Sequence, residues 1–278
     1  MVRRLVRVVS GLAVVAACAE APQVGVIGGP AINAPAPAPV PPAHTHFDTS
    51  IDLPSDDAVV EPSQPYVATV QERVLAHVHT PRGMCSGVVV GPRLVATAHQ
   101  CVPDARGVVA APGEYRVEIA SGSLTWTMRT PSKIVAPNCQ WGDVDLAVLV
   151  LAEPVDWVKP VPMGTVTEPG AKVQALGFGH CAGADHGIRD KAGTILSIDG
   201  EAFTIDVGLC RGDVGGFVVD GAGSLLGIVS HQDDPDDSPR RTTTIFREDT
   251  RFARRLLAQA QQVADATGPA RPSPLTCE

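Results

Sequence analysis

Short apolar runs separated by turn-forming residues are the feature that most constrains how this chain can fold. Between about residue 60 and about residue 250, runs of about six residues rich in Val, Ile and Thr recur roughly every ten to fifteen residues, with Gly, Pro, Asn and Asp between them. LAVLVL at 146–151 and SLLGIVS at 224–230 are two examples. This spacing of short strands predicts an all-β barrel or sandwich.

One segment near the C-terminus has a helical pattern instead. In residues 248–266, Phe252, Leu256 and Val263 fall on one face with Leu257 beside them, while arginines lie opposite and acidic residues stand in the first turn. We expect an α-helix here that closes the folded domain.

The N-terminus has the pattern of an export signal. Basic residues precede an apolar run from Val8 to Ala17, which is too short to span a bilayer but suits the core of a signal peptide over residues 1–17. The Val-Ala-Ala-Cys sequence that ends at Cys18 resembles a bacterial lipobox, in which the cysteine is acylated. Cys18 would then anchor the protein to a membrane of the bacterial cell envelope. The alternative is an ordinary signal peptide and a secreted protein.

Composition divides the rest of the chain into three parts. Residues 18–59 are rich in Pro, Ala and Asp and have too few large apolar side chains for a core, so we interpret them as an extended tether. The folded domain is expected over residues 60–266 and a Pro-rich tail over residues 267–278. No later apolar run approaches the ~20 residues that a membrane helix needs, so the lipid anchor would be the membrane contact.

The charge balance excludes one class of partner. The chain has 30 acidic and 22 basic residues, a formal net charge of −8, and loss of the arginines of the signal peptide makes the mature protein more acidic still. Because phosphate binding needs a basic surface, no nucleic-acid partner is expected.

The cysteine count indicates disulfide bonds. Apart from Cys18 the chain has an even number of cysteines, which in an exported protein is consistent with three disulfides. The count alone leaves every pairing open. These cysteines are Cys85, Cys101, Cys139, Cys181, Cys210 and Cys277.

Several motifs resemble those of trypsin-like serine peptidases of the chymotrypsin fold, in the family's order. This chain has a counterpart for each of six segments of the family. They are the first strand, the catalytic-histidine segment, the strand after the triad aspartate, the G-W-G turn, the nucleophile loop and a strand along the substrate cleft. The counterparts are PYVATV at 65–70, CSGVVVGPRLVATAHQCV at 85–102, GDVDLAVLVL at 142–151, LGFG at 176–179, CRGDVGGF at 210–217 and LLGIVS at 225–230. The resemblance implies two antiparallel six-stranded β-barrels, a cleft between them and a C-terminal α-helix.

The resemblance also indicates where the catalytic triad would lie. Asp145 falls on the triad aspartate, but Val214 stands where the nucleophilic serine belongs, and an isopropyl group cannot attack a carbonyl. When residues 86–102 are aligned with the family motif without gaps, Gln100 falls on the histidine position. Glutamine does not take up a proton near neutral pH, so it cannot act as a general base. His99, one residue earlier, would point away from the cleft on a regular backbone. It is the candidate for a displaced base if the turn has slipped, and otherwise a histidine that packs or hydrogen-bonds behind the active site.

The rest of the cleft departs from the family in a similar way. The backbone N–H groups of Gly212 and Val214 would form the oxyanion hole whatever side chain residue 214 carries. The base of the specificity pocket falls on Gly208, which offers no acid to an Arg or Lys side chain. Ser230 and Gln232 stand on the pocket wall, where Gln232 would narrow it, so a small ligand group is expected.

Two further features follow from the resemblance. In the family, the aspartate at Asp213 pairs with an α-amine that propeptide cleavage releases, but the similar sequence VIGG at 26–29 lies in the tether. Asp213 therefore needs another cation or donor, or the loop around it stays in a zymogen-like, partly collapsed form. Members of the family also have a disulfide bond at the histidine turn, and the resemblance implies that Cys85 and Cys101 form this bond. We next expect Cys181 to pair with Cys210, which leaves Cys139 for Cys277.

Neither a metal nor a cofactor is expected. His44 and His46, and likewise His77 and His79, could share a strand face and bind a metal, but neither pair has an identifiable third ligand.

The leading hypothesis for function is an inactive serine peptidase homologue that binds an unidentified peptide or protein at the remnant cleft. Loss of the nucleophile or the base costs on the order of 10⁶ in kcat where it has been measured. The alternatives are an active serine endopeptidase that uses His99 and an envelope interaction module that does not use the cleft.

Overall fold

Two antiparallel sheets make up most of the described chain. The structure is a computed structural model and describes residues 69–122, 125–139, 144–179, 187–210, 212–232, 243–266 and 275–276. The expected signal peptide and tether, Cys18, His44, His46, Cys181 and Cys277 lie outside the described residues. In chain order the elements are α1 (Val70–Val74), β1 (Leu75–Thr80), β2 (Gly83–Gly91), β3 (Leu94–Thr97), a 3-10 turn (His99–Cys101), β4 (Gly107–Ala110), β5 (Arg116–Gly122), β6 (Thr125–Arg129), β7 (Pro131–Ala136), β8 (Ala147–Leu151), β9 (Lys172–Gly177), β10 (Arg189–Asp199), β11 (Ala202–Ile205), β12 (Phe217–Asp220), β13 (Leu225–Gln232), β14 (Thr243–Arg247) and α2 (Arg251–Asp265).

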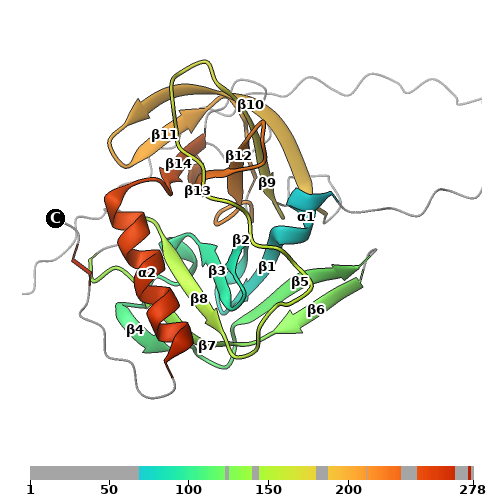
Figure 1. The fold of residues 1–278 in the computed structure, drawn as a ribbon, viewed down its shortest axis with the longest axis vertical. Helices are drawn as coiled ribbons and strands as arrows, with labels where there is room; N and C mark the ends of the chain where they lie inside the picture. The colour runs from blue at the N-terminus through green and yellow to red at the C-terminus, as the bar shows by residue number, and fades with distance from the viewer. Residues whose placement is uncertain are drawn as a thin grey trace, which may run out of the picture. The chain divides into compact units, whose positions relative to one another are not determined.

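The first sheet contains β1 to β8 in the order β4-β7-β8-β3-β2-β1-β5-β6, with antiparallel pairing throughout (Figure 1). All five residues of β8 are buried, which explains why this strand is apolar at every position rather than at alternate ones. Thr97 at the end of β3 pairs with Ala147 at the start of β8. The chain that leaves β3 and the chain that enters β8 therefore lie close together.

The second sheet is a closed barrel in the order β10-β11-β14-β13-β12-β9. Its interior is filled by apolar side chains that include Ile195, Phe203, Ile205, Val229 and Ile245. Other residues of its strands, among them Phe217 on β12 and Ile228 on β13, belong instead to the core of the first sheet. The two sheets are therefore packed together along β12 and β13.

The predicted all-β fold with a C-terminal helix is confirmed. The second barrel has the six strands expected. The first sheet differs from the expected six-stranded barrel: its eight described strands form an open sheet, with β4 at one edge next to β7 and β6 at the other next to β5.

Of the strand expected at residues 65–70, residues 65–68 lie outside the described residues, and a helix begins at the described end of this segment. Thr69 accepts a hydrogen bond from the backbone N–H of Glu72 at 3.1 Å, and the Glu72 carboxylate accepts one from the Thr69 N–H at 2.6 Å. This capping box starts the five-residue helix α1 at Val70. The first strand of the sheet, β1, begins only at Leu75.

The C-terminal helix α2 lies across β7 and β8 (Figure 1). Thr250 caps it by accepting a hydrogen bond from the backbone N–H of Ala253 at 3.1 Å, so the helix begins after the acidic residues that we expected in its first turn. Phe252 is half-buried, and the fully buried side of the helix consists of Ala253, Leu256, Gln259, Ala260, Val263 and Ala264. None of the helices in the described ranges is long and apolar enough to cross a membrane.

Candidate functional site

A 3-10 turn positions Gln100 at the end of the first sheet. The turn follows β3 directly, and the backbone N–H of Cys101 donates to the carbonyl oxygen of Ala98 at 3.1 Å. A disulfide bond from Cys101 to Cys85 ties the turn to β2. His99 and Cys101 are buried, whereas Gln100 is half-buried, so Gln100 is the residue of the turn that reaches the surface of the site.

Gln100, Asp145 and Ser230 form one hydrogen-bonded cluster. The Asp145 carboxylate accepts hydrogen bonds from the Gln100 backbone N–H at 2.8 Å, from Gln100 Nε2 at 2.6 Å and from Ser230 Oγ at 2.7 Å. Gln100 Nε2 also donates to the carbonyl oxygen of Ser230. The side-chain amide therefore directs its two N–H groups to Asp145 and to the backbone of β13.

The neighbours of Asp145 hold its carboxyl group in place but include no group suited to proton transfer in the described cluster. Burial raises the pKa of Asp145 above its ordinary value, while the hydrogen bonds from Ser230 and Gln100 oppose this rise by stabilising the carboxylate. An amide nitrogen donates but has no basic lone pair. The cluster can hold Asp145 in place, but Gln100 cannot accept a proton from a nucleophile.

His99 lies behind this cluster rather than in it. Its ring is fully buried, and Nε2 lies 3.0 Å from the carbonyl oxygen of Ala105 and 3.2 Å from Arg106 Nη1. Burial lowers the pKa of His99 and outweighs the hydrogen bond to Ala105, which raises it. Of the two alternatives for His99, this geometry agrees with a histidine that is hydrogen-bonded behind the site, because the ring is directed toward Ala105.

The loop that carries Gly212 and Val214 is fastened to β2 through Ser86. The Ser86 N–H donates to the carbonyl oxygen of Val214, and Ser86 Oγ donates to that of Gly212, both at 2.8 Å. Gly212 has a φ of 98°, a left-handed conformation that favours glycine. Within the described ranges, the backbone N–H groups of Gly212 and Val214 have no hydrogen-bond acceptor. The described part of the fold therefore does not use either donor.

Asp213, between those two residues, is fully buried. Its carboxylate accepts hydrogen bonds from the N–H groups of Gly179 at 2.5 Å and Cys210 at 2.6 Å, and Arg189 Nε lies 3.2 Å from it. Burial raises the pKa of Asp213, while the Cys210 N–H and the Arg189 charge oppose the rise. A Cβ at residue 179 would collide with the carboxylate, so the LGFG turn requires glycine at its end.

Arg189 is the functional residue that the sequence reasoning missed. It supplies the cation for Asp213 that the motif analysis left unidentified. Antiparallel pairing places Arg189 opposite Gly177, at the end of β9 that leads into the LGFG turn. No local motif marks Arg189, because this position depends on the register between two strands.

Comparison with known proteins agrees with this architecture. The family model Trypsin matches residues 56–254, which is most of the chain. This chain belongs to the trypsin family. No curated protein matches the sequence.

Solved structures of other trypsin-family proteins share the fold. Kallikrein-related peptidase 10 is 20% identical with a TM-score of 0.55, over 72% of this chain and 99% of that one. Neuropsin, a serine protease expressed in the limbic system of mouse brain, is 19% identical with a TM-score of 0.54, over 70% of this chain and 96% of that one. At such low identity, the likeness concerns the fold alone.

Two of the three residues expected at the trypsin-family specificity pocket can be placed. Gly208 is buried, and its neighbour Leu209 packs in the core of the second barrel. Ser230 is half-buried on β13, beside Asp145. The backbone of Gln232 pairs with Thr243, but its side chain lies outside the description.

The Cys85–Cys101 disulfide, which the resemblance to the trypsin family implied, is present. Cys139 and Cys210 are also disulfide-bonded, to partners outside the described residues. Their pairing with Cys277 and Cys181 therefore stays a prediction. The backbone N–H of Asn138 donates to the carbonyl oxygen of Leu275 at 2.7 Å, so the chain next to Cys139 runs beside the chain that leads to Cys277.

Proposed function

We propose that this chain is an exported, lipid-anchored member of the trypsin family that does not cleave peptides and instead binds a peptide or protein at its remnant active site. The observation that carries the proposal is the contact between the Gln100 amide and the Asp145 carboxylate at 2.6 Å. An amide stands there in place of an imidazole, and residue 214 is a valine. The site therefore lacks both a general base and a nucleophile.

The backbone of the nucleophile loop supports binding without catalysis. Ser86 holds the carbonyl groups of Gly212 and Val214, and Arg189 neutralises the buried Asp213 between them. The N–H groups of Gly212 and Val214 have no acceptor among the described residues. Preorganised donors of this kind bind a carbonyl oxygen without needing the serine side chain.

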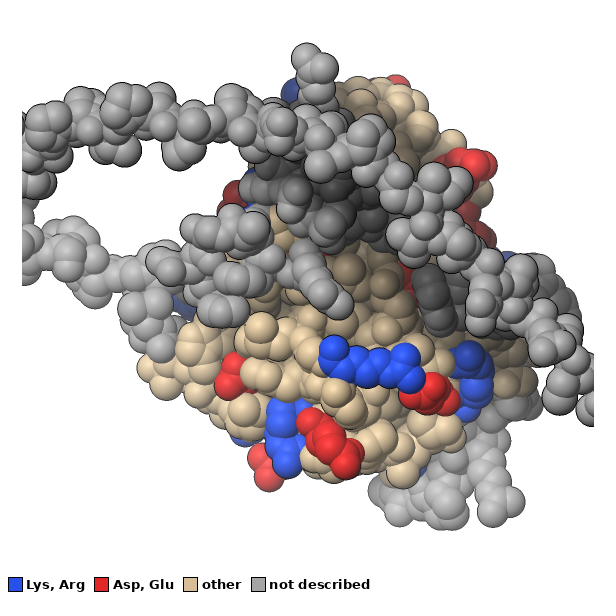
Figure 2. Space-filling model, turned by 180° about the vertical axis from the view of Figure 1, so that it is seen from behind, with Lys and Arg blue, Asp and Glu red and all other residues tan. Residues whose placement is uncertain are grey.

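Surface charge supports a peptide or protein as the ligand rather than a polyanion. On the face seen in Figure 2, Lys and Arg side chains lie beside Asp and Glu side chains, and much of the remaining described surface is uncharged. The chain as a whole is acidic, with a formal net charge of −8. A nucleic acid would need a continuous basic surface.

The alternative of an active peptidase that uses His99 has less support. The His99 ring bonds to the backbone of Ala105 and is fully buried, so it does not reach residue 214 as a base would have to. The alternative of an envelope module that ignores the active site has no contact in its favour among the described residues.

Labelling with a serine-directed fluorophosphonate tests inactivity. We expect no label on the folded wild-type protein and no peptidase turnover above a heat-denatured control, because Val214 offers no oxygen. Turnover that copurifies with the protein and disappears in His99→Ala would overturn the proposal and favour the active peptidase.

Binding is tested with a Kunitz-type inhibitor that carries alanine at the residue entering the specificity pocket. We expect calorimetric binding to the wild-type protein and at least a tenfold loss in Val214→Phe, because the larger side chain fills the site beside the two donors. The matched control is Leu196→Phe, an exposed position on β10, which should bind as the wild type does. Equal binding by both variants would contradict a ligand at the remnant active site.

Export and the anchor rest on the sequence before the folded domain. The apolar run that ends in Val-Ala-Ala-Cys supports acylation of Cys18. We expect mass spectrometry of the membrane fraction to find a lipid-modified peptide that begins at Cys18. An unmodified N-terminus downstream of Cys18 in a secreted protein would contradict the anchor without bearing on the active site.

A further inference from the structure

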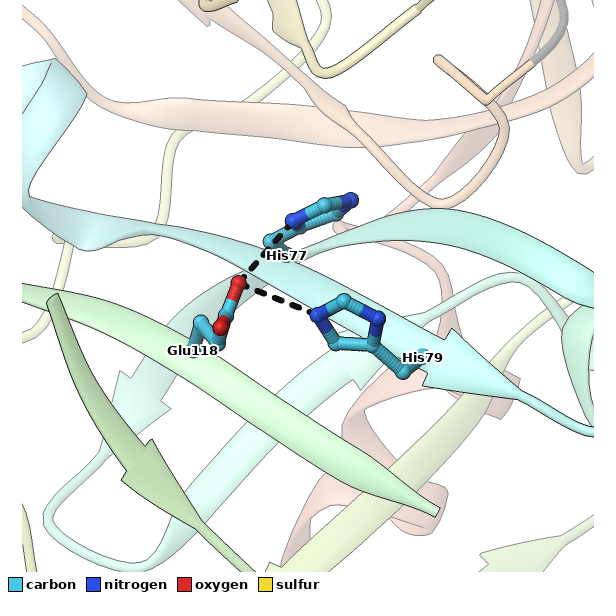
Figure 3. Close-up of side chains that lie close together, drawn as sticks. All are labelled: His77, His79 and Glu118. Atoms are coloured by element: carbon cyan, nitrogen blue, oxygen red, sulfur yellow. Dashed lines mark hydrogen bonds and ion pairs between the residues drawn. The ribbon is translucent and has the colours of Figure 1, made fainter. Parts of the chain in front are cut away.

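A cluster of three ligating side chains lies on the first sheet, separate from the remnant active site. His77 and His79 are alternate residues of β1, and Glu118 on the neighbouring strand β5 pairs with His77. The residues between them in the register, such as Val78 and Val117, are fully buried on the opposite face of the sheet. Figure 3 shows the two imidazole rings and the carboxylate converging on one side of these strands.

The spacing of the ligand atoms matches that of a metal site. Glu118 Oε2 lies 3.2 Å from His77 Nδ1 and 3.0 Å from His79 Nε2. One ligand atom from each residue lies within 4.8 Å of the other two. Neighbouring ligand atoms around a tetrahedral zinc ion with bonds of about 2.0 to 2.1 Å are roughly 3.3 Å apart. Small side-chain rotations would therefore bring all three into the coordination sphere of one ion.

The surroundings suit a bound ion that solvent can reach. The side chains of His77, His79 and Glu118 are 19%, 35% and 29% exposed, so the cluster is partly desolvated but open. On its inner side the His77 ring stacks on Phe178, with ring centroids 4.8 Å apart. Phe178 is in turn in edge contact with Trp126, with ring centroids 5.4 Å apart. These contacts restrict the movement of His77, which lowers the cost of ordering it around an ion.

We propose that His77, His79 and Glu118 form a binding site for a divalent transition metal ion, with zinc as the preferred ion. Two imidazoles and one carboxylate are a ligand set that zinc accepts, and three protein ligands leave a fourth position for water or another donor. Without a metal, one carboxylate oxygen must serve two adjacent imidazoles. A cation of charge two satisfies all three groups together.

The site is positioned to influence the nucleophile loop. Phe178, on which His77 stacks, donates its backbone N–H to Ser86 Oγ at 2.8 Å. Ser86 Oγ in turn donates to the carbonyl oxygen of Gly212. A metal ion that fixes the His77 ring would therefore hold one end of a contact chain that ends at the carbonyl group of Gly212, in the nucleophile loop. Metal binding by His77, His79 and Glu118 does not depend on what the nucleophile loop binds.

The test is calorimetric titration of the tag-free full chain with zinc chloride after dialysis against a chelator. We expect one zinc per folded domain and at least a tenfold loss of affinity in each of His77→Gln, His79→Gln and Glu118→Gln. The matched control is His44→Gln/His46→Gln, which removes the other histidine pair and should leave the affinity unchanged. Thermal unfolding in the presence of chelator shows whether each variant is folded.

Cobalt provides a second readout. Co²⁺ bound in place of zinc should give visible absorption bands in the wild-type protein that are absent in His79→Gln. The proposal is overturned if no stoichiometric binding occurs up to about 1 mM zinc. It is also overturned if folded Glu118→Gln and His79→Gln bind zinc as the wild type does, or if only the His44 and His46 substitutions abolish binding.

Discussion

The guanidinium of Arg189 lies 3.2 Å from the fully buried carboxylate of Asp213. The Arg189 side chain is itself only 12% exposed, so the pair is shielded from solvent. Asp213 lies between Gly212 and Val214, the two residues whose N–H groups we propose as ligand donors. A cation from within the chain therefore stabilises this loop without any requirement for a newly formed N-terminus.

Replacing Arg189 should destabilise the protein strongly. Arg189→Met leaves the Asp213 carboxylate buried without its cation, and breaking a buried ion pair from one side costs about 3 to 5 kcal/mol. We expect a loss of about 3 kcal/mol in the free energy of unfolding, measured by urea denaturation at neutral pH, and a partial recovery in Arg189→Lys.

The matched control for this prediction is an exposed ion pair. Arg82 and Asp104 are in contact at 2.8 Å, but their side chains are 65% and 84% exposed. Solvent screens such a pair, so Arg82→Met should cost less than about 1 kcal/mol. Equal losses in Arg189→Met and Arg82→Met would show that the Asp213 carboxylate does not depend on Arg189.

Glu248 should make the stability of the protein depend on pH. It is fully buried, and its carboxylate oxygens accept no hydrogen bond from any described residue. Burial, assisted by the charge of Asp249, raises the pKa of Glu248 to about 8 from an ordinary value of 4.5. The folded state therefore keeps a proton that the unfolded state releases, so stability falls as the pH rises from about 4.5 to about 8.

Glu248→Gln removes this titration while keeping the shape of the protonated side chain. The free energy of unfolding of the variant should exceed that of the wild type by an amount that grows between pH 5 and pH 9, to on the order of 4 kcal/mol. Urea denaturation at a series of pH values measures the difference. A difference independent of pH would mean that Glu248 is already ionised in the folded protein.

The Cys85–Cys101 disulfide should contribute to stability through the turn that holds Gln100. It closes a loop of sequence separation 16, and a loop of about 15 residues corresponds to about 3 kcal/mol. We expect Cys85→Ala/Cys101→Ala to lose about this amount in urea denaturation. A peptide map that links Cys85 to another cysteine would contradict the pairing itself.

The strands and the final helix could be predicted because their signals are local. Apolar runs such as Ala147–Leu151 became strands, and the amphipathic pattern near Leu256 became α2. One local signal was overlooked. Thr69 and Glu72 have the spacing of a capping box, which indicates that a helix starts at Val70, the last residue of the segment where we expected a strand.

The contacts that define the site could be predicted only in part. The motif placed Gln100 and Asp145 at corresponding positions, but the direction of the His99 ring depends on how the 3-10 turn packs against Ala105. The Arg189–Asp213 pair and the approach of Glu118 to His77 depend on strand register. Register depends on how the hydrophobic patterns of two strands match and on turn geometry, so it cannot be read from one short segment alone.

The final prediction concerns the two substitutions at the triad positions, which should act as a unit. Val214→Ser alone should not react with a fluorophosphonate, because Gln100 cannot accept the hydroxyl proton. Gln100→His alone has no nucleophile to activate. The double variant places an imidazole in contact with Asp145, at the site where the amide now accounts for the 2.6 Å bond. It adds a hydroxyl beside the N–H groups of Gly212 and residue 214, so we expect covalent labelling of the introduced serine, measured by mass spectrometry.

Turnover should remain slow, because a pocket based on Gly208 holds no charged group to bind a substrate side chain. A folded double variant that retains its disulfides and still fails to label would show that the loop does not present its donors to a reacting carbonyl. Labelling of Val214→Ser alone that requires His99 would instead show that the His99 ring can leave Ala105 and act as the base.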